Sequence, residues 1–444
     1  MRIAKGLICV ATINACVGAV LADENWPRFR GADATGVAAD NPGLPSEWDT
    51  EKNVTWSTEI PGWGWAQPIV WDGRVYVSSV LSDGDYEFPK KGLYLGRGRS
   101  EPPETLHHWL VYCLDLNSGD ILWKREPITA KPNVPRHPKA TYASETPTTD
   151  GKRLYVLFGD VGLFCYSFEG DLIWKQEIES KKTMYGYGAA ASPIVHDDQV
   201  IMVYDNHESS YIAAYDTETG SENWRIDRDE KSTWATPFVW QNSIRTEIIV
   251  PGKKKNRSYD LKGNVNWTIA GPMSNLVIPS PFADSGLLYI TSGYIGDKER
   301  PVYAIKPGMS GDIDFEDEDV DKQEFLEWYL PQAGPYNPTP ILYRGLYYTL
   351  HDRGFVTCHD AKTGEEVYGK KRFAPGASFT ASPWAYNGKL FFLSEDGETY
   401  VVKAGPEFEL EGTNPLDEIA MASPAISGDK LLIRTGSKIY CLTK

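Results

Sequence analysis

The sequence predicts an all-β protein, an eight-bladed β-propeller of four-stranded blades, from three features. Its 444 residues include 25 Tyr, 15 Trp, 15 Phe, 40 Gly and 30 Pro, a composition that suits many short strands joined by tight turns. A small or polar residue followed by proline recurs eight times along the chain. A glycine turn with an aromatic residue four positions later recurs as well. Repeats of this length are typical of propeller blades.

The proline pairs mark the start of each repeat. Most neighbouring pairs are 41 to 46 residues apart, and insertions explain the two longer intervals of 79 and 59 residues. After each pair come an apolar run split by a polar-Gly turn, another strand, a second turn and an aromatic residue. This order predicts four strands per unit, with the first strand innermost. The pairs are Gln67-Pro68, Thr146-Pro147, Ser192-Pro193, Thr236-Pro237, Ser280-Pro281, Thr339-Pro340, Ser382-Pro383 and Ser423-Pro424.

The second turn of each repeat is written "AYDTETGSENW" at residues 214–224 and "CHDAKTGEEVY" at residues 358–368. Glycine permits the positive backbone angles of such a turn. A large aromatic residue that recurs at one register predicts packing between adjacent blades. We therefore expect a structural docking role, and not catalysis, for Trp56, Trp123, Trp174, Trp224, Trp267 and Tyr368.

The two ends of the chain predict how the ring closes. The last unit, from Ser423 onward, supplies only three strands. The unpaired segment "VTWSTEI" at residues 54–60 resembles the fourth strands of other units. The N-terminal strand should therefore complete the last blade, which removes an open sheet edge. Residues 51–444 form the expected propeller, with an N-terminal extension at residues 23–50 that packs on it.

Residues 1–22 have the pattern of a secretory signal peptide. Arg2 and Lys5 precede an apolar run that ends in Val20-Leu21-Ala22, a small-residue pattern suited to cleavage. A membrane anchor and a lipid attached to Cys16 are the alternatives. No later stretch is long and apolar enough to span a bilayer. We expect a periplasmic or secreted monomer with no transmembrane segment in the mature chain.

Charge and cysteine content narrow the partners and the covalent chemistry. The formal net charge is -16, and removal of the two basic residues of the leader makes it more negative. Nucleic acid is excluded as a partner, because its binding depends on Lys and Arg that neutralise phosphates. Four of the six cysteines remain after cleavage: Cys113, Cys165, Cys358 and Cys441. They occupy equivalent strand positions, so we expect small buried thiols instead of disulfides.

These residues resemble the tryptophan-docking repeat of the PQQ-like (quinoprotein-type) β-propellers. Ala214, Asp216, Thr219, Gly220 and Trp224 match that repeat, and Cys113, Asp115, Ser118, Gly119 and Trp123 match it loosely. The resemblance covers about residues 51–444 and implies an eight-bladed propeller. The family contains PQQ-dependent dehydrogenases and non-enzymatic proteins of the BamB type, which assemble outer-membrane proteins. The opening "NWPRFRGADATGV" resembles the leader of secreted PQQ-like repeat proteins.

The sequence departs from the dehydrogenase branch of that family. The resemblance implies two adjacent cysteines against the cofactor and a Glu, Asn and Asp set that holds calcium, yet no Cys-Cys pair is present. The chain also has no P-loop, no HExxH zinc pair and no GxSxG elbow. Its seven scattered histidines do not predict a metal site. We expect no cofactor, no metal and no catalytic residue, with PQQ and Ca²⁺ as the alternative.

Two insertions interrupt the repeat. The acidic segment 311–328 alternates Asp312, Asp314 and Glu316 like a calcium loop, but Asp317 and Gln323 replace the required Gly and Glu. It predicts a solvated acidic hairpin. The segment 82–107 is rich in Gly, Pro and charge, and Lys90, Lys91, Arg97 and Arg99 suit an acidic partner as well as a flexible cover.

The residues that lead into the innermost strands should surround one mouth of the central channel, together with the loops that open on the same face. Aromatic side chains with a few polar groups in a concavity suit a binding site, although the same aromatics also suit packing between blades. The aromatic candidates are Trp63, Trp65, Tyr142, Tyr185, Tyr187, Trp234, Tyr336 and Phe379. The loop candidates are Asp160, Asp205, His207, Asp352, Arg353, Glu395 and Asp396.

Two functions follow from these features. The first is a non-catalytic binding or scaffold propeller of the cell envelope that holds a protein or glycan partner on its channel-mouth face. The second is a quinoprotein oxidoreductase that oxidises an alcohol or sugar with PQQ. The first is preferred, because the motifs found are structural ones.

Overall fold

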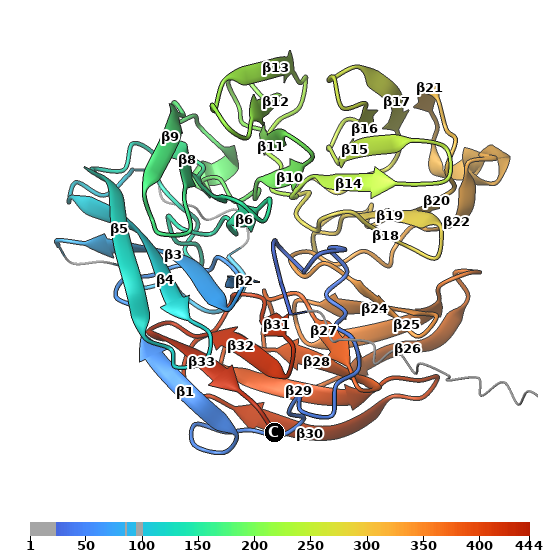
Figure 1. The fold of residues 1–444 in the computed structure, drawn as a ribbon. Helices are drawn as coiled ribbons and strands as arrows, with labels where there is room; N and C mark the ends of the chain where they lie inside the picture. Colours follow the sequence, from blue (N-terminus) through green and yellow to red (C-terminus); the bar gives the residue numbers. More distant parts are fainter. Residues whose placement is uncertain (1–23, 85–86, 95–100) are drawn as a thin grey trace, which may run out of the picture.

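The computed structural model describes residues 24–84, 87–94 and 101–444. Eight sheets stand around a central channel, as Figure 1 shows. Each is a blade of four antiparallel strands, and blade 4 gains a fifth strand from an insertion. The predicted eight-bladed propeller is confirmed. Apolar clusters fill the spaces between neighbouring blades: one joins blades 2 and 3, and another joins blades 3 and 4.

The first four blades follow the proline pairs in order. Blade 1 contains β2 (Ile69–Trp71), β3 (Arg74–Ser82), β4 (His107–Asp115) and β5 (Ile121–Ala130). Blade 2 contains β6 (Thr148–Thr149), β7 (Leu154–Phe158), β8 (Gly162–Tyr166) and β9 (Leu172–Glu177). Blade 3 contains β10 (Ile194–His196), β11 (Gln199–Tyr204), β12 (Tyr211–Asp216) and β13 (Glu222–Asp227). Blade 4 contains β14 (Phe238–Gln241), β15 (Thr246–Val250), β16 (Asn256–Tyr259) and β17 (Val265–Ala270).

The other four blades complete the ring. Blade 5 contains β18 (Phe282–Asp284), β19 (Leu287–Thr291), β20 (Val302–Ile305) and β22 (Leu326–Leu330). Blade 6 contains β23 (Ile341–Tyr343), β24 (Leu346–His351), β25 (Phe355–Asp360) and β26 (Glu366–Arg372). Blade 7 contains β27 (Trp384–Tyr386), β28 (Lys389–Leu393), β29 (Glu398–Lys403) and β30 (Glu409–Pro415). Blade 8 contains β31 (Ala425–Ser427), β32 (Lys430–Arg434) and β33 (Lys438–Leu442) with β1 (Val54–Glu59).

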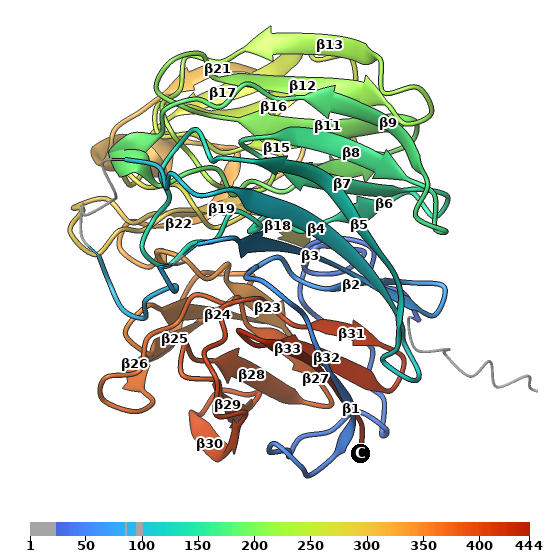
Figure 2. The same cartoon turned by 90° about the vertical axis from the view of Figure 1, so that its left-hand side faces the viewer.

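Closure occurs through the N-terminal strand, as predicted. Strand β1 pairs antiparallel with β33 and becomes the outermost strand of blade 8, with Trp56 opposite Cys441. The side view in Figure 2 shows β1 beside β32 and β33 at the end of the chain. This pairing covers the edge that β33 would otherwise expose.

Docking between blades uses one contact that recurs at five junctions. The indole N–H of the outer-strand tryptophan donates to a backbone carbonyl in the turn of the following blade, at 2.9 to 3.1 Å. The glycine of that turn lies against the indole face. At Gly220, with φ +71°, a Cβ would lie 2.5 Å from Trp174, so only glycine fits there. The donors are Trp56, Trp123, Trp174, Trp224 and Trp328.

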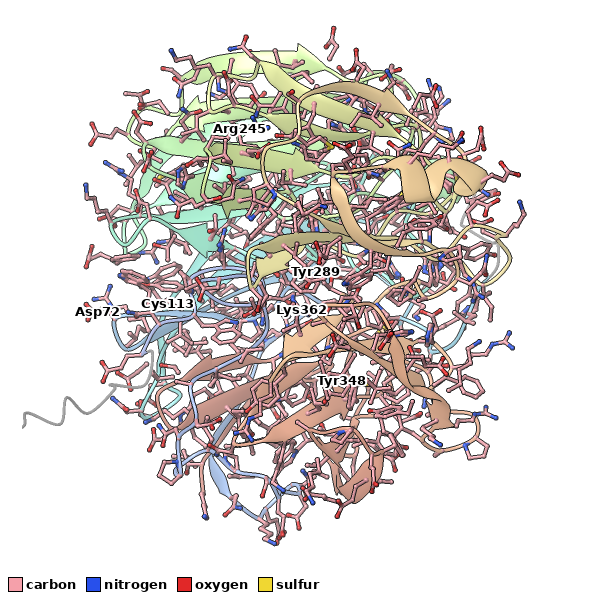
Figure 3. The ribbon with its side chains drawn as sticks, turned by 90° about the vertical axis from the view of Figure 1, so that its right-hand side faces the viewer. Asp72, Cys113, Arg245, Tyr289, Tyr348 and Lys362 are labelled. Atoms are coloured by element: carbon pink, nitrogen blue, oxygen red, sulfur yellow. The ribbon has the colours of Figure 1, made fainter. Side chains whose placement is uncertain are left out.

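The repeated cysteines have a packing role in this arrangement. Cys113, Cys165, Cys358 and Cys441 are free and buried, as expected. Each lies directly opposite a docking aromatic residue across the sheet, as Cys165 does with Trp174. Figure 3 shows Cys113 among the stacked sheets, with Asp72 at their margin. A small side chain is needed beneath the indole, and alanine fills the same place at Ala214 and Ala304.

The acidic insertion changes the docking of blade 4. Its first part forms β21 (Gly311–Asp314), which pairs in parallel with β17, and its second part is a 3-10 helix, η2 (Asp317–Lys322). The expected acidic hairpin is therefore wrong. Because β21 lies beside Trp267, that indole donates to Glu247 of its own blade at 2.7 Å. The insertion also separates Trp328 from the regular spacing, and the sequence pattern missed it.

The N-terminal extension runs across one face of the ring and over the end of the channel (Figure 1). It pairs with blade 1 through Trp26 and Val70, and with blade 7 through Val37 and Ala385. Trp48 is buried and stacks on Phe391 at 6.0 Å. The extension therefore packs on several blades before it enters β1.

Candidate functional site

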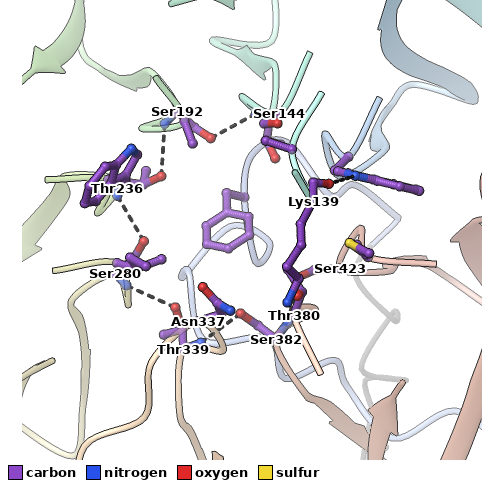
Figure 4. A pocket seen from close by; sticks show the side chains of 18 of the residues that line it. Lys139, Ser144, Ser192, Thr236, Ser280, Asn337, Thr339, Thr380, Ser382 and Ser423 are labelled. Carbon is purple, nitrogen blue, oxygen red and sulfur yellow. Dashed lines mark hydrogen bonds between the residues drawn. The ribbon is translucent and has the colours of Figure 1, made fainter. Parts of the chain in front are cut away.

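A belt of hydroxyl groups surrounds the channel at the proline pairs. The backbone N–H of each pre-proline residue donates to the Ser or Thr hydroxyl of the next blade, at 2.9 to 3.1 Å, through seven consecutive junctions. Figure 4 shows these bonds between Ser192, Thr236, Ser280 and Thr339. The "hydroxyl belt" consists of Thr146, Ser192, Thr236, Ser280, Thr339, Ser382 and Ser423. The pre-proline residues thus link the innermost strands of the blades.

The eighth junction ties the belt to the N-terminal extension. Gln67 replaces the hydroxyl there, and its carboxamide accepts the N–H of Arg30 at 2.7 Å and donates to the carbonyl of Pro424. The Arg30 guanidinium donates to the carbonyls of Thr339 and Pro340 at 3.1 and 2.8 Å. Phe29, beside Arg30, lines the channel. The extension therefore forms the floor of the channel.

Above the belt lies a cavity of about 210 Å³, lined by residues from the extension and the blades. Its aromatic wall consists of Trp65, Tyr187, Trp234 and Tyr336, all predicted candidates. Each of them is less than 10 % exposed. The indoles of Trp65 and Trp234 donate to the carbonyls of Lys139 and Gly188 at 2.7 and 2.8 Å, so their rings are held rigidly beside the cavity.

A buried ion pair joins Lys139, whose carbonyl accepts the indole N–H of Trp65, to Glu395. The Lys139 ammonium lies 2.5 Å from Glu395 Oε1, and both side chains are nearly or fully buried. Lys139, labelled in Figure 4, precedes blade 2, and Glu395 belongs to blade 7, so the pair links segments on either side of blades 1 and 8. Glu395 Oε1 also accepts the hydroxyl of Thr380 at 2.8 Å. The charge of Lys139 is thereby compensated.

Two further ionisable groups lie near this ion pair. His137 lines the cavity, and burial together with Lys139 and Arg136 lowers its pKa to about 3. Its Nδ1 accepts the backbone N–H of Lys139 at 3.1 Å, which places the proton of the neutral ring on Nε2. Burial raises the pKa of Asp352 to about 7, against the opposing effect of Lys139.

Part of the insertion of blade 1 lies over the channel mouth. We call residues 87–94 the "cover segment". In this segment the backbone N–H of Gly92 donates to Glu395 Oε2 at 2.7 Å, and the backbone N–H of Lys90 donates to the carbonyl of Pro138 at 2.9 Å. Lys91 forms an ion pair with Asp396. Tyr187 donates its hydroxyl to the carbonyl of Tyr94 at 3.2 Å. Arg97 and Arg99 lie outside the described residues.

Several predicted site residues do not face the cavity. Phe379 is fully buried against Phe373 and Tyr400, and the Tyr142 hydroxyl donates to Val134 at 2.9 Å. Trp63 pairs with Val80 and packs against Trp65. These side chains pack the blades and the mouth.

The predicted loop residues also differ in whether they lie near the cavity. Asp205 forms a fully buried two-bond ion pair with Arg228, at 2.8 and 3.1 Å, which rules out a free carboxylate at the mouth. His207 and Arg353 are exposed. Of these residues, Asp352 and Glu395 lie close to the cavity. Asp352 accepts the backbone N–H of Asn337, and Glu395 accepts the hydroxyl of Thr380; Asn337 and Thr380 both line the cavity.

The residues that the pattern missed are Lys139, His137, Asn337 and Phe29. Phe29 lies in the extension and the others lie in the segments before β6 and β23, where no repeat predicts a function. The proline pairs did include the belt residues, but they predicted only the spacing of the repeats and no function for these hydroxyls.

The cavity lining does not fit a calcium-bound quinone. Calcium takes six to eight oxygen ligands, among which carboxylates dominate. Among the described residues, the lining supplies hydroxyls and one carboxamide, and no Asp or Glu. No cluster of His, Cys, Asp and Glu suited to a metal occurs in the described part of the chain.

Comparisons with known proteins support the fold. The family described as "Outer membrane protein assembly factor BamB" matches residues 108–307. No curated protein sequence matches the chain. BamB from Moraxella catarrhalis aligns with a TM-score of 0.58 at 11 % identity, over 88 % of this chain and 97 % of that chain.

Two dehydrogenase structures are similar to the same extent. A europium-containing methanol dehydrogenase aligns with a TM-score of 0.61 at 10 % identity, over 95 % of this chain and 98 % of that chain. The quinohemoprotein alcohol dehydrogenase from Comamonas testosteroni gives a TM-score of 0.58 at 13 % identity, over 95 % and 80 % of the two chains. At these identities the likeness concerns the fold and does not choose between the functions.

Proposed function

We propose that this β-propeller of PQQ-like repeats is a non-catalytic binding module of the cell envelope, which acts as a monomer and receives a polar group of a glycan or protein partner in its channel. The observation that carries the proposal is the cavity between the hydroxyl belt and the cover segment. It combines rigid aromatic faces with many hydrogen-bonding groups, as ligand sites do.

The ionisable groups of the cavity favour binding over catalysis. A general base works best with a pKa near the operating pH. His137, with a pKa of about 3, is a weak base, and Lys139 is held in an ion pair with Glu395. Asp352 has a pKa of about 7, but it lies behind Asn337 and does not line the cavity. The described lining contains no cysteine and no carboxylate to act as a nucleophile.

An envelope location agrees with the leader pattern, although residues 1–22 and Cys16 lie outside the described residues. None of the helices in the described part of the chain is long and apolar enough to cross a membrane. A periplasmic or secreted protein is the location we propose.

The second candidate is a quinoprotein oxidoreductase, because two dehydrogenases share the fold. Purified protein given PQQ with Ca²⁺ would then retain the quinone absorbance after gel filtration and reduce an artificial dye in the presence of an alcohol. A binding module gives neither signal.

Filling the cavity is expected to abolish binding. Ala190 lines the cavity beside Tyr187 and Trp234, and Ala190→Trp would occupy part of its volume. We expect the tagged variant, purified from the native envelope, to retain at least ten-fold less bound glycan or protein than the parent. Mass spectrometry measures the amount of bound material. Overpacking costs about 1–3 kcal/mol, so a thermal melt checks the fold.

Ala39→Trp is the matched control, because Ala39 is exposed on the face of the N-terminal extension. It should retain the bound material. Equal retention by both variants would contradict a channel site.

A further inference from the structure

The belt hydroxyls have unused donors that face one space. Each oxygen accepts one backbone N–H, yet no hydrogen bond between described residues uses a belt O–H as the donor. All seven side chains line the cavity and are less than 10 % exposed. Buried hydroxyls normally satisfy both roles. Seven O–H groups around the same cavity therefore have no acceptor in the described part of the chain.

Two further polar side chains of the cavity lining, Tyr336 and Asn337, also lack a hydrogen-bond partner among the described residues. The Tyr336 side chain is 8 % exposed and lines the cavity, and its hydroxyl makes no hydrogen bond to any described residue. Burial raises its pKa, so the hydroxyl keeps its proton at neutral pH. The side-chain amide of Asn337 also lines the cavity and has no partner among residues 24–84, 87–94 and 101–444.

The charge beneath the belt is positive and uncompensated. Arg30 is fully buried, and no described carboxylate lies within ion-pair distance of it. Burial lowers its pKa to about 9, so it remains largely charged at pH 7. Its hydrogen bonds to Thr339 and Pro340 carbonyls place this charge directly behind the belt. In a chain with a net charge of -16, the cavity floor is locally favourable to an anion.

We propose that the channel floor binds a small oxyanion group, a carboxylate or a phosphate, carried by the ligand. The inference rests on the proposed binding function and gives its ligand a chemical class. The belt hydroxyls, Tyr336 and Asn337 donate to the oxyanion. The faces of Tyr187 and Trp234 lie beside the uncharged part of the ligand. Hydrogen bonds to charged oxygens are stronger than neutral ones, and a buried site strengthens them further.

Calorimetric titration of the purified chain with sodium phosphate, sodium acetate and sodium chloride at constant ionic strength tests this site. We expect saturable binding of phosphate or acetate and none of chloride, and the two oxyanion arms separate the two ligand sources. Tyr336→Phe, which removes one oxygen, should weaken the affinity by roughly ten-fold, because bonds to charged groups are the strong class. Asn337→Ala is the second variant and should weaken binding in the same direction.

Tyr440→Phe is the control, because Tyr440 lies on β33 in blade 8 and outside the cavity lining. Its affinity should equal that of the parent. Heat signals that are equal for chloride and phosphate, or that Tyr336→Phe and Asn337→Ala leave unchanged, would overturn the anion site. Loss of partner retention by Ala190→Trp would in that case leave the binding function standing. If retention were also unaffected, both proposals would be wrong.

Discussion

Trp174→Ala is expected to lower the free energy of unfolding by about 3–5 kcal/mol, the usual range for truncation of a buried tryptophan. The indole lies against Gly220, donates to the carbonyl of Thr217 at 3.0 Å and packs near Tyr155. Its loss leaves a void between blades 2 and 3, and the carbonyl of Thr217 keeps only the hydroxyl of Tyr155 as a donor. Urea unfolding followed by fluorescence of the remaining tryptophans measures the change.

Ile173→Ala is the matched control, since its side chain is 45 % exposed on the same strand. Its effect should stay within about 0.5 kcal/mol. Trp174→Phe keeps most of the bulk and removes the N–H, so it should fall between the two. Equal stabilities of the two alanine variants would contradict docking through the tryptophan.

Asp205→Ala is expected to destabilise the protein by about 3–5 kcal/mol, because removal of one partner leaves a buried, uncompensated charge. Both side chains of the Asp205–Arg228 pair are fully buried. Asp205 also accepts the hydroxyl of Thr233 at 2.6 Å. Thermal and urea unfolding check the loss, while the affinity for any channel ligand should be unchanged.

The double variant Asp205→Leu with Arg228→Met should recover much of the stability, since apolar replacement of a buried pair is often nearly neutral. Glu222→Ala breaks the partly exposed pair with Arg225 and should cost less than about 1 kcal/mol. A loss from Asp205→Ala no larger than that from Glu222→Ala would contradict the buried ion pair.

The architecture was predictable because short sequence patterns determine it, and these patterns recur in successive blades. The hairpin turns, the glycine turns with their aromatic residues and the proline pairs each depend on a few neighbouring residues. Even ring closure followed from one unmatched strand around Trp56. Docking departed from the pattern where the insertion at residues 311–328 displaced Trp328 from its repeat, and at Tyr368, which has no indole N–H to donate.

The site was only partly predictable, because it is assembled from residues far apart in the sequence. The aromatic wall follows from its place before the innermost strands, so Trp65, Tyr187 and Trp234 were found. Lys139 and Glu395 meet across the channel although 256 residues separate them. Asp205 has the same sequence context as a mouth loop, yet it lies in the core opposite Arg228. The spacing of the repeats does not predict ion pairs such as Lys139–Glu395 and Asp205–Arg228.

The central claim is that the channel mouth is the binding face, and site-specific photo-crosslinking in living cells tests it most directly. A photoreactive phenylalanine at position 185 lies beside Tyr187 at the mouth, whereas one at position 172 lies on the exposed outer strand of blade 2. The account predicts covalent adducts with an envelope component from position 185 and none from position 172. Adducts from position 172 alone, or equally from both, would contradict it.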